Sequence, residues 1–139
     1  MQGYFQRLSA ADNKLQNEQT AALRPQQINA DNIIDDQEKQ SIRESIDRIL
    51  SALEAFRTAF AKLNPPPGIE AEHNEALTQL DGLIAAFRET SDRVQNAKSL
   101  DDLIAAFADA DAAKKALTQA CLALQKIAES NNIAVKLRC

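Results

Sequence analysis

The fold is decided by residues 42–63, IRESIDRILSALEAFRTAFAKL, because their apolar side chains recur at alternating steps of four and three. This spacing puts one apolar side chain per turn on the same side, which is the pattern of an amphipathic helix. Asp35 with Glu38 three residues later predicts a capping box, so we expect a helix over 36–63, about eight turns long. The apolar positions are Ile42, Ile46, Ile49, Leu53, Phe56, Phe60 and Leu63.

The same periodicity predicts three more helices, over 3–24, 68–97 and 100–131. Three consecutive prolines at 65–67 separate the second helix from the third, because proline lacks an amide donor and disfavours helical backbone before it. Ser99 with Asp102 is a capping signature that starts the last helix. Apolar and polar residues alternate over 133–139, so we expect an extended tail packed on the helices.

Short connections make the last three helices antiparallel neighbours. We therefore expect an all-α fold, a single domain over 1–139 that forms an antiparallel four-helix bundle with a short extended C-terminal tail. The alternative is a three-helix bundle with a loose N-terminal arm. Phe56, Leu80 and Phe107 occupy mid-helix apolar positions, and we expect them to be buried.

Charge and hydropathy exclude two classes of partner. The net charge is −4 with both signs interspersed, so the chain lacks the basic stripe that binds nucleic acid. No apolar run approaches the roughly 20 residues that a transmembrane helix needs. The first residues, MQGYFQR, do not form a signal peptide. Either the protein is cytoplasmic, or a signal peptide precedes residue 1.

The chain has two cysteines, Cys121 on the apolar side of the last helix and Cys139 at the last position. The tail is long enough to fold back and reach Cys121. A disulfide would stabilise the fold by about 3 kcal/mol, whereas the alternative is one buried and one exposed free thiol. We favour the disulfide, because a free terminal cysteine is a reactive liability, and we infer an oxidising compartment.

Two segments carry a resemblance, ACLALQKIAESNNIAVKLRC at 120–139 and LNPPPGIEAEHNEAL at 63–77. Together, over about residues 50–139, they resemble uncharacterised secreted helical domains and lipoproteins of Gram-positive and related bacteria. Asn132 stands where that group's pattern has glycine. The resemblance implies an exported protein, either free or tethered by a lipid anchor upstream of residue 1, and it implies no activity.

Two polar residues on apolar faces are candidate ligand contacts. His73, the single histidine, is either a ligand or pH-sensitive contact, or a corner residue bonded to a backbone carbonyl. Lys114 lies between Ala110 and Leu117 on the last helix. It either receives an acidic ligand group inside the bundle or extends to the edge while its stem packs.

We expect no catalytic residues, no cofactor and no metal site. The acidic pairs at 35–36 and 101–102 lie at helix starts, where capping explains them. A serine or cysteine nucleophile would need His73 as its base, and no glycine-rich phosphate loop is present.

Three functions remain open. The first is a non-catalytic extracellular or cell-envelope interaction or structural domain, with a protein partner or self-association. The second is an extracytoplasmic small-ligand-binding or sensor four-helix bundle. The third is a cytosolic helical adaptor or self-assembling subunit with reduced cysteines.

Overall fold

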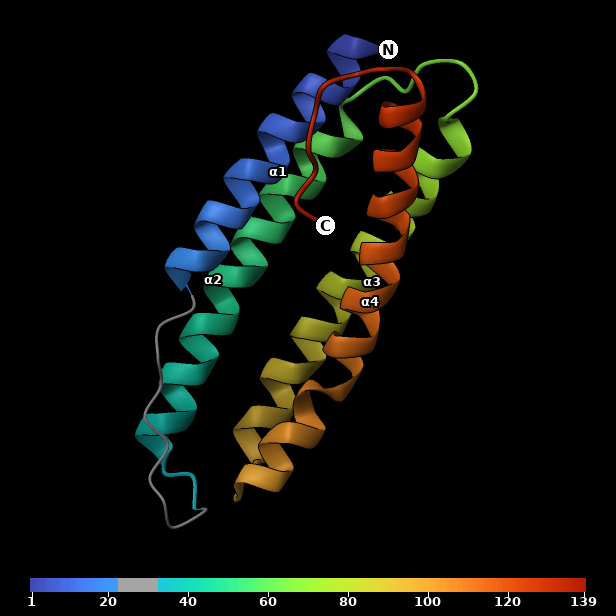
Figure 1. Cartoon of the computed structure of the whole chain (residues 1–139). Coiled ribbons are helices and arrows are strands. Elements are labelled where there is room, and N and C mark those ends of the chain that lie inside the picture. The colour runs from blue at the N-terminus through green and yellow to red at the C-terminus, as the bar shows by residue number, and fades with distance from the viewer. Residues whose placement is uncertain (23–32) are drawn as a thin grey trace.

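The computed structural model describes residues 1–22 and 33–139. Its elements are four helices, α1 (Gln2–Ala22), α2 (Asp36–Ala61), α3 (Glu70–Asn96) and α4 (Leu100–Ser130). Successive helices run antiparallel, and the chain after α4 folds back as an extended tail (Figure 1). This confirms the expected all-α four-helix bundle. The three-helix alternative is wrong, because α1 packs along α2 and buries Tyr4, Phe5, Leu8 and Leu15.

The predicted helix starts depend on side-chain caps, and two of them are confirmed. The carboxylate of Asp35 accepts the amide of Glu38 at 2.8 Å, and the Glu38 carboxylate accepts the amide of Asp35 at 3.3 Å. The hydroxyl of Ser99 caps α4 by accepting the amide of Asp102. The third helix begins at Glu70 and not at the predicted residue 68, because Gly68 has a φ of 94°, which lies outside the helical region.

The helix ends differ from the prediction by one or two residues. Helix α2 ends at Ala61 and not at 63, since the prolines at 65–67 bias the residues before them away from helical backbone. Helix α3 ends at Asn96, because Ala97 is extended. Helix α4 ends at Ser130, and Asn132 adopts the left-handed conformation with a φ of 55°, which asparagine tolerates at a helix end. The predicted end of the first helix, at 24, lies outside the described residues.

Helices that follow one another in the sequence pack closely together: α1 with α2, α2 with α3, and α3 with α4. Helices α3 and α4 approach closely enough for the buried Thr90 hydroxyl to donate to the backbone oxygen of Ala106 at 2.9 Å. Exposed ion pairs join α2 to α3, such as Arg57 with Asp81 at 2.9 Å. Pairs of this kind contribute about 1 kcal/mol or less, so apolar burial holds the helices together.

The core has a larger and a smaller part. The larger part joins all four helices and the tail residue Leu137, and the smaller one includes Ile34, Ile46 and Val94. Ile34 reaches this smaller part because its amide binds the oxygen of Lys98. None of the helices in the described part of the chain has the length and apolarity needed to cross a membrane.

Of the three mid-helix residues that we expected to be buried, only one is fully buried. Leu80 is completely buried, whereas Phe56 and Phe107 are only half-buried. Phe107 packs at the edge of the smaller part of the core. Phe56 borders a cavity, which leaves part of its ring without a protein neighbour.

Candidate binding site

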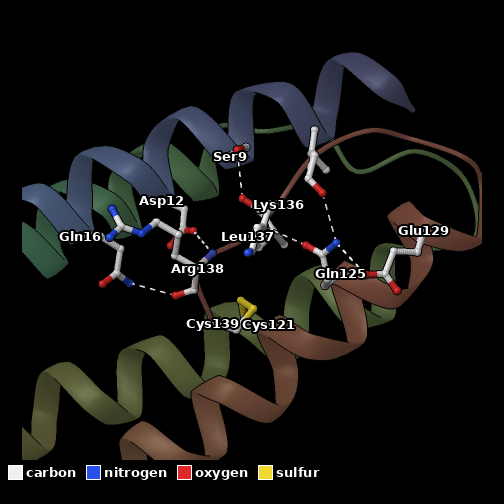
Figure 2. The surroundings of a disulfide bond; sticks show 11 residues. Ser9, Asp12, Gln16, Cys121, Gln125, Glu129, Lys136, Leu137, Arg138 and Cys139 are labelled. Carbon is white, nitrogen blue, oxygen red and sulfur yellow. Dashed lines mark hydrogen bonds between the residues drawn. A yellow bond between two sulfur atoms is a disulfide. The ribbon is translucent and has the colours of Figure 1, made fainter.

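A disulfide joins Cys121 of α4 to Cys139 at the end of the tail. The two Cα atoms are 5.7 Å apart, within the usual range for such a bond. Cys121 is half-buried against the larger part of the core. The predicted disulfide is therefore present, and it fastens the tail to the side of α4 (Figure 2).

Besides the disulfide, the amide side chain of Gln125 holds the tail to α4. Its oxygen accepts the amide of Leu137 at 2.8 Å, and its nitrogen donates to the carbonyl of Val135 at 3.2 Å (Figure 2). The side chain thus pairs with the tail as a neighbouring strand would, and satisfies backbone groups that the extended tail leaves unpaired.

The α1 edge of the tail is held by Asp12 and Gln16. The carboxylate of Asp12 accepts the amide of Arg138 at 2.6 Å, and the Gln16 amide donates to the carbonyl of Arg138 at 3.2 Å (Figure 2). The Asp12 side chain is buried although it is acidic, and its bond to the tail offsets the cost of that burial. The tail therefore lies between α1 and α4 and contacts both.

A cavity of about 200 Å³ lies beside the tail, between α1 and α4. Its lining comes from all four helices and from the tail. The residues are Leu8, Asp12, Leu15, Gln16, Gln19, Ile49, Leu53, Phe56, Phe60, Ala76, Leu83, Phe87, Lys114, Leu117, Thr118, Cys121, Leu124, Leu137, Arg138 and Cys139.

The polar residues of this lining are distributed unevenly. Helices α2 and α3 contribute only apolar side chains, among them Phe56, Phe60 and Phe87. The polar and charged residues belong to α1, α4 and the tail, the elements on either side of the opening. The cavity therefore has an apolar interior and a polar mouth, which is the usual composition of a small-molecule site.

Several residues that the periodicity assigns to the core lie only half-buried around this cavity. They are Phe56, Phe87, Leu117 and Cys121. Each continues the apolar stripe of its helix, but part of its side chain faces the cavity. The cavity thus interrupts a core that the sequence continues, so its walls offer apolar surface to an occupant.

Lys114, one of the two predicted ligand contacts, lines the mouth of the cavity. Its side chain is exposed, and no described residue forms an ion pair or hydrogen bond with its ammonium group. Thr118, one turn further along α4, also lines the cavity. On the outside, both residues border a shallow depression together with Asp111 and Lys115.

His73, the other predicted contact, does not line the cavity. It is buried, and its Nδ1 lies 2.9 Å from the hydroxyl of Tyr4 and its ring 4.5 Å from that of Phe60. The predicted bond to a backbone carbonyl is therefore wrong, since the first helix supplies a hydroxyl at this corner. Burial lowers the pKa of His73 and raises that of Tyr4, so both side chains are neutral near pH 7.

Among the described residues, no three histidine, cysteine or acidic side chains gather as a metal site would require. Comparisons of the chain with protein-family models, with curated proteins and with solved structures found no match. The resemblance of residues 50–139 to secreted helical domains therefore stays a prediction.

The sequence interpretation missed Asp12, Gln125 and the cavity. Asp12 did carry a signal, because it follows Leu8 by four residues and thus lies beside the apolar stripe of its helix. Gln125 carried none, since a glutamine next to Leu124 on a long helix is ordinary.

Proposed function

We propose that this protein is a non-catalytic, extracytoplasmic small-ligand-binding four-helix bundle whose site is the cavity between α1 and α4. The observation that carries the proposal is the cavity itself, which is lined by apolar side chains from all four helices. A purely structural domain gains nothing from such a gap, because an unfilled cavity forfeits the packing of its walls. A ligand would restore that packing.

The size of the cavity limits the ligand. An engineered apolar cavity of about 150 Å³ is large enough to bind benzene, and the present cavity measures about 200 Å³. The ligand is therefore a compact molecule, one ring or a short alkyl chain, with a polar end that stays at the mouth.

The disulfide supports the extracytoplasmic part of the proposal. Disulfides persist in oxidising compartments and are rare in the cytosol, which disfavours the cytosolic adaptor with reduced cysteines. The resemblance to secreted helical domains and lipoproteins points the same way, and a lipid anchor upstream of residue 1 stays part of this proposal. A protein partner or self-association stays a prediction.

The experiment is a titration of the oxidised protein with octanol, which is apolar and uncharged, followed by calorimetry and thermal unfolding. Binding to the folded state raises the free energy of unfolding, by about 2.7 kcal/mol at a hundredfold excess over Kd. We expect Leu117→Trp, which fills the cavity from a half-buried position, to abolish this effect.

The matched control is Leu122→Trp, the same change on the same helix at an exposed position outside the cavity lining. It should bind octanol as the parent protein does. If octanol does not bind, or binds equally to both tryptophan variants, the cavity is not the ligand site.

A further inference from the structure

The polar side chains at the mouth of the cavity are not equally available to a ligand. On α1, the carboxylate of Asp12 and the amide nitrogen of Gln16 already bind the backbone of Arg138. The side chain of Arg138 points toward α1 in Figure 2, and Arg138 also lines the cavity. The Asp12 carboxylate and the Gln16 amide nitrogen are therefore engaged in holding the tail.

The α4 side of the mouth is different. Lys114 lines the cavity and has no ion pair or hydrogen bond with any described residue. Asp111 lies one turn before Lys114 and borders only the outer depression. It forms no ion pair with Lys114. Thr118 follows Lys114 by four residues, so the two side chains share one face of the helix. An ammonium group and a hydroxyl thus stand side by side at the edge of an apolar cavity.

From this arrangement we propose that the ligand is a small anionic amphiphile, whose acid group binds Lys114 and Thr118 while its apolar body fills the cavity. The inference rests on the proposed function and names its ligand class. An ammonium and a hydroxyl can both donate to an anionic oxygen, whereas a cationic head would meet an uncompensated like charge. The shared chemistry is a single acid group on a compact apolar body, and the acid is either a carboxylate or a phosphate.

The test compares four probes of one chain length, octanoate, octyl phosphate, octanol and octylamine, by calorimetry on the oxidised full chain. We expect both anions to bind more tightly than octanol, by roughly 2- to 5-fold for an exposed charge pair. Octylamine should bind more weakly than octanol. The ratio between octanoate and octyl phosphate identifies which acid the site prefers.

The matched variants are Lys114→Met and Lys115→Met, which remove the same charge from adjacent positions on α4. Only Lys114 lines the cavity, although both are exposed, so neither change is expected to impair folding. Lys114→Met should lose the preference for anions and keep the affinity for octanol. Lys115→Met should keep both. Lys114→Glu should reverse the order of octanoate and octylamine.

The outcomes separate this inference from the proposed function. If octanol binds and the anions bind no better, the anionic ligand class is wrong while the cavity remains a binding site. If Lys115→Met reduces anion binding as much as Lys114→Met does, a general surface charge attracts the anions and the assignment to Lys114 is overturned. If octanol does not bind, the proposed function fails as well, whatever the anions do.

Discussion

Helix α4 has two neighbours, and it meets them in different ways. Against α3 it packs closely, with Ala106 near enough to accept a hydrogen bond from Thr90. Toward α1 it is separated, at one end by the tail and beyond it by the cavity. The first interface is filled by side chains of the two helices alone, whereas the second needs an additional segment and still leaves space.

The difference follows from residue size and from connection length. Alanines at 106 and 110 are buried on α4, and small side chains allow two helices to approach. The connection between α3 and α4 is also short, since it runs only from 97 to 99. Helices α1 and α4 are distant in sequence, and the tail that joins them is fixed by a covalent bond. One interface is thus built for stability, and the other keeps an apolar surface accessible.

The largest expected effect compares a leucine of the closed core with one that borders the cavity. Leu80→Ala removes a completely buried side chain outside the cavity lining and should cost roughly 2–5 kcal/mol of unfolding free energy. Leu117→Ala should cost less than half as much, because Leu117 is half-buried and already borders empty space. Urea unfolding of both variants measures the difference, and equal losses would mean that the cavity is filled in solution.

The second effect concerns the covalent hold on the tail. Reduction of the disulfide, or Cys139→Ser, should lower the free energy of unfolding by about 3 kcal/mol, since the bond restricts the unfolded chain. The freed tail then retains the packing of Ile133, Val135 and Leu137 and its hydrogen bonds to Gln125 and α1. The amides of Leu137 and Arg138, which donate two of these bonds, should therefore exchange faster with solvent. Hydrogen exchange under oxidising and reducing conditions checks this. Unchanged protection of these amides would show that the tail stays bound without the disulfide.

The closed parts of the molecule could be predicted from the sequence because local patterns determine them. The capping box at Asp35, the cap at Ser99 and the left-handed stop at Asn132 each involve residues within a few positions of one another. The disulfide was also predictable, because only two cysteines exist and the tail has the reach to join them.

The open interface could not be predicted, because periodicity tells which side of a helix faces inward but not how far away the opposing side chain lies. Phe56 has the same position in its stripe as fully buried residues, yet it borders a cavity. The burial of Asp12 depends on the backbone of Arg138, which is 126 positions away. Lys114 was recognised as unusual from its apolar neighbours, but only the structure places it at a cavity mouth.

A smaller effect concerns the contact between α3 and α4. Thr90→Val keeps the shape of the side chain and removes the hydroxyl, which lies 2.9 Å from the backbone oxygen of Ala86 on its own helix and 2.9 Å from that of Ala106 on α4. The expected cost is about 1 kcal/mol, the usual net value of one buried hydrogen bond. The control is Thr78→Val on the same helix, whose hydroxyl bonds only to its own helix at an exposed position. Chemical unfolding compares the two variants, and an equal cost would show that the bond between the helices contributes nothing.

The smallest expected effect on stability at neutral pH comes from His73, whose hydrogen bond with Tyr4 joins α3 to α1. Burial lowers the pKa of His73 in the folded protein. The unfolded chain therefore takes up a proton first as the pH falls. The contribution of neutral His73 is complete above the unfolded pKa of about 6.5. It is lost as the pH falls toward the folded pKa, with a slope of at most about 1.4 kcal/mol per pH unit for one proton.

Urea unfolding at several pH values between about 7 and 5 measures this slope, in a range above the titration of most carboxylates. His73→Gln should remove the His73 part of the slope. Tyr4→Phe should retain most of it, because burial and not the hydroxyl causes the pKa shift. If His73→Gln leaves the slope unchanged, the imidazole has the same pKa in both states. The corner between α1 and α3 would then be open to water. It would resemble the open interface between α1 and α4 and not the closed one between α3 and α4.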